Sequence, residues 1–465
     1  QKDPGYLPAI NALAKVAYEN QDFTAAFSLL GFLVKNDPGN SIWLNNLGVV
    51  AAGRGDLVLA RGLLQQAIMV SGSKNEVLYN LGCLAVNEND KDAALKIFSQ
   101  FIAVEPGHIW ALFALSRIAK ELGRVDEAII YCRKLVELAP NEAEFRQNLG
   151  FLLLKTGDWE EGFKLYEARW QANRLSTLPS AQLWDGDISQ LKDKTILLWA
   201  EQGLGDTLQF ARYLPQLQTI ARQVIVAVPD LLLGLMQGSF PLLEVVSKDD
   251  VFENELKRPN YELQAPLLSL PYLFGSTLAN LPGRVPYLQI EKDFLERWRK
   301  DLGSAEKLRV GLVWGGNPAH RNDARRSMAL SQFASLFRVD GVSWYSLQKG
   351  EQEKELEDFL GASGSVCPEN LAPKLESFED TAAVIDLLDL VISVDTSVAH
   401  LAGALARPTW LLLPFDADWR WMLERDDSPW YPTMNLFRQP TPGDWQSVIA
   451  AVQDRLEGFV KGATV

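Results

Sequence analysis

The sequence repeats itself every 34 residues over its first 170 positions, and this period constrains the fold more than any other feature. One leucine recurs at this step, as Leu13, Leu47, Leu81, Leu115 and Leu149. The residue that follows it is small each time, as Ala14, Gly48, Gly82, Ser116 and Gly150. A second small residue comes thirteen positions after the leucine, as Ala26, Ala60, Ala94, Ala128 and Gly162. Three units close with Pro38, Pro106 and Pro140, and a fourth closes with Gly72.

This period and pattern are typical of the tetratricopeptide repeat (TPR), a unit of two antiparallel helices. Small residues are expected where the two helices cross closely, and proline ends the second helix because it lacks an amide donor. Each unit buries its apolar face only against its neighbours, so the units stack into a superhelix. We therefore predict an all-α domain over 1–170 with five clear units. Pro4 shares the phase of Pro38, which predicts the tail of an earlier repeat and a natural protein that is longer at its N-terminus.

The concave face of such a superhelix usually holds a peptide or a protein, so the groove predicts a protein partner. Two other roles stay open: the repeats brace the next domain, or they join two copies of the chain into a homo-oligomer.

Composition excludes several classes of protein. The chain has 465 residues, which is too many for one compact core, and its formal net charge is −14. A general nucleic-acid binder would need a basic face, so we expect no nucleic-acid partner. The three cysteines, Cys83, Cys132 and Cys367, show neither zinc spacing nor an even disulfide framework. The apolar runs are too short to span a bilayer and no signal peptide is visible, so we expect a cytoplasmic protein.

Beyond the repeats, short apolar strands alternate with helices, which predicts parallel sheets with crossover helices. A polar connector is expected over 171–193. We predict an N-terminal lobe over 194–305 and a C-terminal lobe over 306–465. A helix at 443–460 packs across one lobe or between the two. The predicted fold class is thus α plus α/β, with two Rossmann-like lobes facing each other across a cleft. In such sheets ligands bind beyond the carboxyl ends of the strands.

One candidate site follows the strand that ends at Val394, where a helix begins at once. Asp395 or Thr396 can cap this helix. The free amides of Thr396, Ser397 and Val398 would then point at a diphosphate, helped by the helix dipole. His400 lies one turn further on the same face and could contact phosphate or ribose. The alternative is a capped helix with a buried, hydrogen-bonded histidine.

A second candidate is the loop from Glu201 to Asp206, which follows the first strand of the N-terminal lobe. Gly203 and Gly205 let the backbone turn tightly and approach a ligand. Asp206 is either a general base facing the cleft or a carboxylate that caps the helix.

A third candidate segment runs from Asn317 to Ser327 and is rich in arginine and histidine. Guanidinium groups suit phosphate, so we expect donor contacts from Asn317, His320, Arg321 and Arg325, with Arg326 in the same stretch. Gln348 and Lys349 follow the next strand and could reach the same ligand. The alternatives are a solvated basic loop and a surface lysine.

Two further patterns favour structural roles. The C-terminal region is crowded with tryptophans, which could stack on a base or sugar but more often form core: Trp410, Trp419, Trp421, Trp430 and Trp445. The triplets at 416–418 and 185–187 resemble a metal-binding Asp-x-Asp, but neither follows a clear strand of the first lobe. We expect no metal and no cofactor, with a nucleotide-sugar acting as co-substrate.

With these segments in place, the chain resembles bacterial TPR-containing glycosyltransferases of the GT-B fold. Gly205-Asp206 matches the first loop of the heptosyltransferase family (family 9), whose aspartate is the proposed catalytic base. Residues 395–405, DTSVAHLAGAL, match that family's donor-diphosphate motif. The combination of TPR and GT-B is similar to the O-linked N-acetylglucosamine transferases (family 41), and Lys349 loosely matches their donor-phosphate lysine. The segment 428–439, SPWYPTMNLFRQ, is typical of the TPR-linked group.

The resemblance implies an inverting transferase that needs no bound metal. Asp206 would take the proton of an acceptor hydroxyl, and the 396–398 amides with Arg321, Arg325 or Lys349 would stabilise the leaving diphosphate. The TPR domain would present the acceptor, a serine or threonine of a protein such as flagellin or another surface protein. Two alternatives stay open: a transferase acting on a glycan or lipid, and a non-catalytic TPR scaffold with a lapsed sugar-nucleotide domain.

Overall fold

The computed structural model describes residues 6–70, 75–173, 181–282, 284–304, 306–320, 322–363 and 367–463. The chain divides into two compact units, Gln1–Leu149 and Gly150–Val465. Within the described ranges, none of the helices combines the length and the apolar character that a membrane crossing would require. Pro4, on which the expectation of an earlier repeat rests, lies outside the described residues.

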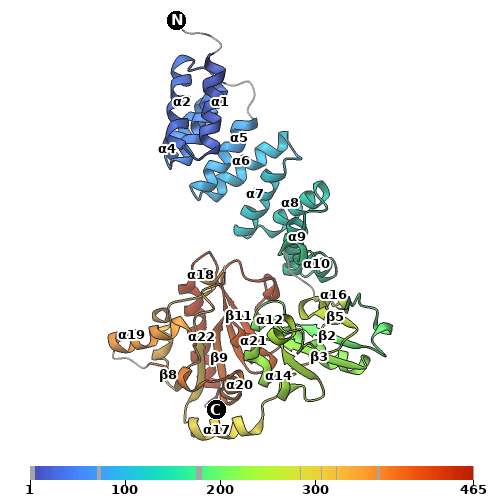
Figure 1. Ribbon diagram of the computed structural model, residues 1–465. Coiled ribbons are helices and arrows are strands. Elements are labelled where there is room, and N and C mark those ends of the chain that lie inside the picture. Colours follow the sequence, from blue (N-terminus) through green and yellow to red (C-terminus); the bar gives the residue numbers. More distant parts are fainter. Residues whose placement is uncertain are drawn as a thin grey trace. The chain divides into compact units, whose positions relative to one another are not determined.

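The first unit is entirely helical and confirms the predicted hairpins (Figure 1). Its helices pair in sequence order: α1 (Tyr6–Glu19) with α2 (Phe23–Asn36), α3 (Ser41–Gly53) with α4 (Leu57–Val70), α5 (Asn75–Asn87) with α6 (Lys91–Val104), and α7 (Ile109–Glu121) with α8 (Val125–Leu138).

The recurring small residues lie where the paired helices cross. A Cβ atom added to Gly48 would come within 2.8 Å of Leu64, and one added to Gly82 within 2.6 Å of Phe98. The turn inside each hairpin also needs one residue in the left-handed region, and that residue recurs at the same 34-residue step: Gln21, Gly55, Asn89, Gly123 and Gly157. The repeat period is therefore set by helix contact and turn geometry together.

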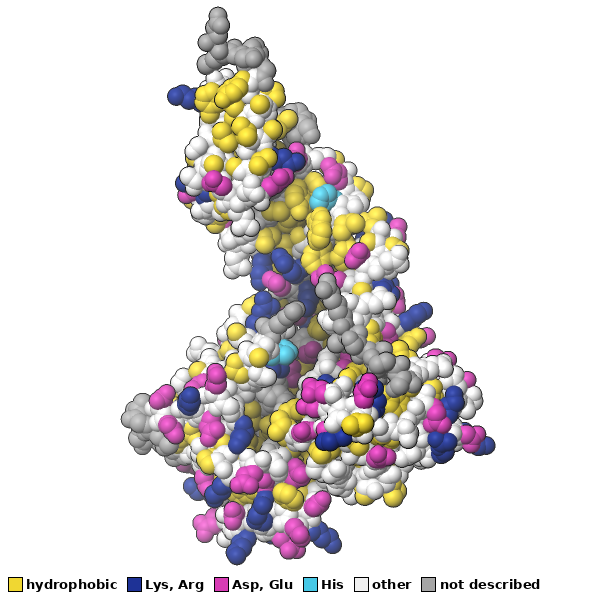
Figure 2. All heavy atoms as spheres, viewed as in Figure 1, with side chains coloured by type: hydrophobic (Ala, Val, Ile, Leu, Met, Phe, Trp, Pro, Cys, Tyr) yellow, Lys and Arg dark blue, Asp and Glu magenta, His cyan; other side chains and the backbone are white. Residues whose placement is uncertain are grey.

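Hydrophobic side chains are exposed over parts of the repeats, as the yellow areas of Figure 2 show. Leu13 is 58% exposed, although the leucines at the same repeat position, Leu47 and Leu115, are buried. On the face shown in Figure 2, lysine and arginine side chains of the second unit are interspersed with aspartate and glutamate.

The boundary between the two compact units falls earlier than the domain boundary expected at residue 170. Helix α9 (Ala143–Thr156) runs from the first unit into the second, and α10 (Trp159–Tyr166) and α11 (Arg169–Ala172) lie wholly within the second. Trp159 stacks on Trp430 with ring centroids 4.9 Å apart, and the ring of Phe163 lies edge-on to that of Trp419. The end of the repeat array therefore shares a core with the α/β lobes.

The N-terminal lobe is built on a parallel five-stranded sheet of order β1-β5-β2-β3-β4. Its strands are β1 (Gln182–Leu183), β2 (Thr195–Trp199), β3 (Gln223–Val228), β4 (Glu244–Ser247) and β5 (Leu263–Pro266). Its helices are α12 (Leu204–Phe210), α13 (Leu214–Ile220), α14 (Leu233–Ser239), α15 (Lys248–Glu253) and α16 (Leu270–Leu273). Strand β1 falls within the segment expected as a connector, and residues 174–180 of that segment lie outside the described residues.

The C-terminal lobe has a parallel six-stranded sheet of order β11-β10-β9-β6-β7-β8. Its strands are β6 (Leu308–Val313), β7 (Val342–Ser346), β8 (Glu369–Asn370), β9 (Leu390–Val394), β10 (Thr409–Leu413) and β11 (Met434–Arg438). Its helices are α18 (Asp323–Arg326), α19 (Lys354–Ser363), α20 (Phe378–Leu387), α21 (Ser397–Ala404) and α22 (Trp445–Ala463). The two parallel sheets confirm the predicted α plus α/β class.

The packing of two helices shows to which lobe each of them belongs. Helix α22 packs on the C-terminal lobe alone, because Trp445, Val452 and Leu456 share a buried cluster with residues of β6 and β7. Helix α17 (Lys292–Leu302) was expected in the N-terminal lobe, yet it packs on α20, where the Trp298 indole donates a 2.8 Å hydrogen bond to Asp380.

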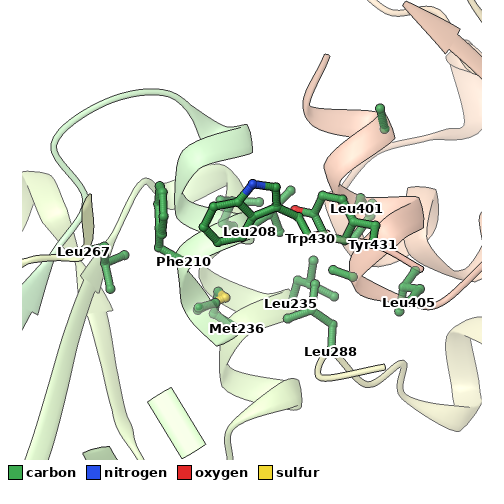
Figure 3. Close-up of a cluster of buried hydrophobic side chains, with 14 of the residues drawn as sticks. Leu208, Phe210, Leu235, Met236, Leu267, Leu288, Leu401, Leu405, Trp430 and Tyr431 are labelled. Carbon is green, nitrogen blue, oxygen red and sulfur yellow. The ribbon is translucent and has the colours of Figure 1, made fainter. Parts of the chain in front are cut away.

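The two lobes are joined by a continuous apolar core (Figure 3). Leu208, Phe210 and Leu235 of the N-terminal lobe belong to the same buried cluster as Leu401 and Tyr431 of the C-terminal lobe. This contact holds α12 of the N-terminal lobe against α21 of the C-terminal lobe. The cleft between the lobes stays a prediction.

Candidate functional site

The order of the strands shows where each lobe should bind a ligand. In the C-terminal lobe β6 comes first, β7 and β8 extend the sheet to one side, and β9 to β11 extend it to the other. The strand order therefore reverses between β6 and β9, and ligands of doubly wound sheets bind at such a point, beyond the carboxyl ends of the strands. The segments that leave these two strands are 314–326 and 395–400, both of which the sequence had marked as candidates.

The loop that carries Asp206 packs directly on the helix that carries His400. Helices α12 and α21 lie side by side, and a Cβ atom added to Gly205 would come within 2.7 Å of the His400 ring. Gly205 is therefore required for close packing between the lobes rather than for a tight turn. The contact brings two motifs that are almost 200 residues apart in sequence to one place.

Asp206 has two protein partners and remains partly open to solvent. Its Oδ2 accepts a 2.9 Å hydrogen bond from the amide of Gly203, the residue that caps α12. Its Oδ1 accepts a hydrogen bond from the guanidinium of Arg420. The Asp206 side chain keeps 19% of its surface exposed. A carboxylate oxygen has two acceptor sites, so both oxygens can still receive a proton from a third group. The capping role and the predicted catalytic role are thus compatible.

Arg420 is the central residue of the site, and the sequence analysis missed it. It lies in the 3₁₀ turn Trp419–Trp421, and its buried guanidinium donates to Gln209 at 2.6 Å, to Asp418 at 2.8 Å and to Asp206. Burial would raise the pKa of Asp418, but the charge and hydrogen bonds of Arg420 outweigh it and hold that pKa below its ordinary value. The tryptophans around Arg420 were the available signal, since a charge inside an aromatic run needs buried partners.

Helix α21 contains a buried histidine that is neutral at physiological pH. His400 Nδ1 lies 2.9 Å from the Tyr431 hydroxyl and its ring lies over Trp421. Burial, and then the positive charge of Arg420, lower the pKa of His400 to about 3. His400 Nε2 is 4.0 Å from Asp395, whose pKa burial raises to about 6, helped by the negative charge of Asp418. This arrangement is the buried, hydrogen-bonded histidine that the sequence left open as an alternative.

Among the described residues, backbone amides at the start of α21 have no protein partner, and ligand binding there stays a prediction. Thr396 caps the helix through its backbone, while its hydroxyl lies 3.1 Å from that of Ser393. In the part of the chain that the structure describes, the amides of Ser397 and Val398 have no protein acceptor. Free amides at a helix start suit an anion.

The 317–326 segment contributes a different arginine from those predicted. Arg325 is exposed, and Arg321 lies outside the described residues. Arg326 pairs with the buried Asp323, and its charge acts on both Asp395 and His400. It partly offsets the rise that burial causes in the pKa of Asp395, and it adds to the lowering that burial causes in the pKa of His400.

The other two predicted residues of this segment lie at the surface. Asn317 is exposed, and its side chain accepts a 3.0 Å hydrogen bond from the amide of Ala319. His320 is exposed, and its Nδ1 accepts from the amide of Asn322. Burial, followed by the charge of Arg326, lowers the pKa of His320.

Gln348 and Lys349 are engaged by the backbone. The Gln348 side chain is buried and forms four backbone hydrogen bonds, two accepted from Trp314 and Gly315 and two donated to Gly315 and Lys349. Lys349 donates to the carbonyls of Ala372 and Leu375 at 2.8 and 3.0 Å. Gln348 therefore shapes the loop after β6 in this structure, and direct donor contact by either residue stays a prediction.

The acidic triplets form no metal site among the described residues. Asp416 pairs with Lys155 at 2.5 Å and Asp418 pairs with Arg420, so both carboxylates are neutralised by cations. At 185–187, both aspartates accept hydrogen bonds from nearby backbone amides. The tryptophans singled out in the sequence are buried, which is the core role that the sequence favoured: Trp410, Trp419, Trp421, Trp430 and Trp445.

Both the helical repeats and the α/β part of the chain match known protein families. Residues 11–75 and 79–143 match the tetratricopeptide repeat. Residues 345–412 match glycosyltransferase family 9 (heptosyltransferase). The second match runs from the end of β7 into β10 and includes Asp395 to His400. The chain therefore carries TPR repeats and a glycosyltransferase family 9 segment.

Among curated proteins, the chain is similar to Protein FlbA of Caulobacter vibrioides, with 26% identity over 366 residues that cover 73% of this chain. The matched region spans 60% of the length of that relative. Among solved structures, it is similar to MamA 41-end from Desulfovibrio magneticus RS-1, with 16% identity and a TM-score of 0.32 over 36% of this chain and 94% of that chain. Another crystal structure of MamA shares 22% identity, with a TM-score of 0.32 over 35% of this chain and 94% of that chain. TM-scores this low carry no conclusion about the present chain.

Proposed function

We propose that this chain, which joins TPR repeats to a glycosyltransferase family 9 segment, is an inverting glycosyltransferase of the GT-B type. It moves a sugar from a nucleotide-sugar donor to a serine or threonine hydroxyl of a protein, without a bound metal. The observation that carries the proposal is the contact between Gly205 and His400, because it places Asp206 of one lobe beside the donor motif of the other.

The donor site is assigned to the point where the strand order of the C-terminal lobe reverses. The amides of Ser397 and Val398 and the guanidinium of Arg326 are the groups that would receive the diphosphate. Arg326 presents a permanent positive charge, and amides at a helix start add the helix dipole. Neutral His400, a residue of this helix, contacts Tyr431 and Trp421 and is not required to carry charge.

The chemistry follows from these positions. The acceptor hydroxyl gives its proton to Asp206 while its oxygen forms a bond to the anomeric carbon. The bond from that carbon to the diphosphate oxygen breaks, and the leaving diphosphate takes the electron pair. Arg326 and the α21 amides stabilise the charge that grows on it. Arg420 keeps the Asp206 carboxylate in place for the proton transfer.

The acceptor is proposed to be a protein because of the repeats. Exposed apolar and aromatic side chains on the repeat helices, such as Trp110 and Ile42, offer the kind of contact area that protein partners use. A second copy of the chain is the other use for them.

A thermal-shift panel with UDP, ADP, GDP, CMP and their common sugar conjugates tests the donor site. A ligand at about 100 times its dissociation constant adds roughly 2.7 kcal/mol of stability. One nucleotide should stand out, and its shift should be lost in Arg326→Met. Arg325→Met is the matched control, because this neighbouring arginine is exposed and should leave the shift unchanged. No shift with any nucleotide would contradict the proposal and favour a non-catalytic scaffold.

A further inference from the structure

Arg169 is a fully buried arginine at the end of the repeat array, with 0% of its side chain exposed. Its guanidinium holds Glu201 with two hydrogen bonds, from Nε at 2.6 Å and from Nη2 at 3.0 Å. Nη2 also donates to the hydroxyl of Ser269 at 2.8 Å, and Nη1 donates to Glu167. Ser269 in turn donates to Glu167, so the four side chains form one hydrogen-bonded cluster.

The place of this cluster in the fold is informative. In the N-terminal lobe β2 is the middle strand of the sheet, with β3 and β4 on one side and β5 and β1 on the other. The order therefore reverses between β2 and β5, which is where this sheet would bind a ligand. Glu201 follows β2 and Ser269 follows β5. Arg169, from the short helix α11 that follows the last repeat hairpin, joins the two segments that leave these strands.

Glu201 also opens the loop that ends at Asp206. Four residues lie between Glu201 and Asp206, and this stretch of backbone makes the turn into α12. A two-point hydrogen bond fixes the orientation of a carboxylate as well as its position. The start of the Asp206 loop is thus set by a residue of the short helix after the repeats, while its end is set by Arg420.

We propose that Arg169 is a positioning residue, through which the short helix α11 after the last repeat hairpin fixes the loop of Asp206 for proton transfer. The inference rests on the proposed function for the role of Asp206. A buried ion pair costs desolvation, and replacing both partners by apolar side chains often leaves stability unchanged. Fold stability alone therefore does not require this ion pair. A fixed orientation of the Glu201 carboxylate at the start of the loop does require it.

The test is the double variant Arg169→Met/Glu201→Leu, which removes both charges and avoids leaving one of them buried alone. Thermal denaturation confirms that it folds. Hydrogen exchange then follows the amides of Gly203 and Thr207, which bond to Asp206 and to the Gly203 carbonyl. We expect both amides to exchange at least about tenfold faster than in the wild type, because the loop loses its anchor. Arg222→Met, which removes a half-exposed pair with Glu262 in the same lobe, should leave this exchange unchanged.

Steady-state kinetics with the donor found by the thermal-shift panel supply the second measurement. A loop displaced by about 1 Å should lower kcat ten- to a hundredfold, while the donor KM stays within about twofold. Unchanged exchange in the double variant would overturn the positioning of the loop by Arg169. Faster exchange with an unchanged kcat would overturn its role in catalysis. A wild type that transfers no sugar would overturn the proposed function instead, and the exchange result alone would then decide whether Arg169 sets the loop.

Discussion

Arg420 donates a hydrogen bond to Asp206 from the opposite lobe, across 214 positions of sequence. The same guanidinium also donates to Asp418 and Gln209, so it cannot move with Asp206 without breaking these hydrogen bonds. The carboxylate that we assign as the base is therefore held by both lobes. Relative movement of the lobes would change its orientation.

Asp206→Asn should preserve the fold and the affinity for the donor nucleotide but lower the rate of transfer. The amide oxygen still accepts a hydrogen bond, yet it cannot take a proton, and general-base catalysis contributes roughly 10²- to 10⁴-fold. Single-turnover transfer assays and nucleotide titration measure the two effects separately. Asp249→Asn, an exposed carboxylate in the same lobe, is the matched control. Full activity of Asp206→Asn would show that another group takes the proton.

Gly205→Ala should destabilise the chain by about 1–3 kcal/mol, because the new methyl group would overlap the His400 ring. That ring cannot move aside easily, since Tyr431 holds its Nδ1 and Trp421 covers its face. Gly203→Ala is the matched control: its Cβ would approach Asp206 no closer than 3.4 Å. Urea denaturation of the two variants compares them. Equal stabilities would mean that α12 and α21 are not in close contact.

Asp395→Asn should change stability in a pH-dependent way. Burial raises the pKa of Asp395 to about 6 in the folded chain, so its contribution to stability is present below about pH 4 and is lost as the pH rises through 6. Asparagine stays neutral throughout. The stability of the variant relative to the wild type should therefore rise between pH 4 and 6, by up to about 1.4 kcal/mol per pH unit.

Urea denaturation at several pH values measures this difference. His400 has a pKa lowered to about 3 by burial, so acid destabilises the fold through it between about pH 6.5 and 3. Both proteins retain His400, so it enters the comparison only through any change in its pKa when the Asp395 charge, 4.0 Å away, is removed. A difference that is flat from pH 4 to 7 would show that Asp395 keeps an ordinary pKa.

Trp159→Ala should destabilise the α/β unit by about 3–5 kcal/mol, although residue 159 belongs to the repeat pattern. Its ring is buried and stacks on Trp430, beside the turn that carries Arg420. Trp110→Ala is the matched control, because Trp110 is 65% exposed and should change stability by no more than about 0.5 kcal/mol. The fluorescence of the remaining tryptophans reports unfolding. Equal effects of the two variants would place the last hairpin outside the core of the second unit.

Local patterns in the sequence were enough to determine the hairpins, the two parallel sheets and the segments that leave their central strands. These features depend on spacing along the chain: a 34-residue step for helix crossings, and apolar strands that alternate with helices. The same spacing identified Asp206 and the start of α21 as candidates, because both follow a strand directly.

Only the tertiary structure decided which side chains meet. Arg420, Arg326 and Arg169 each act on partners brought close by packing, and no spacing in the sequence links Arg169 to Glu201 or Arg420 to Asp206. The same holds for the last repeat hairpin, whose sequence is that of a repeat but whose aromatic face is buried against Trp419 and Trp430. Repeat periodicity depends on contacts with neighbouring units, whereas ion pairs and the boundary of a core depend on what lies opposite in space.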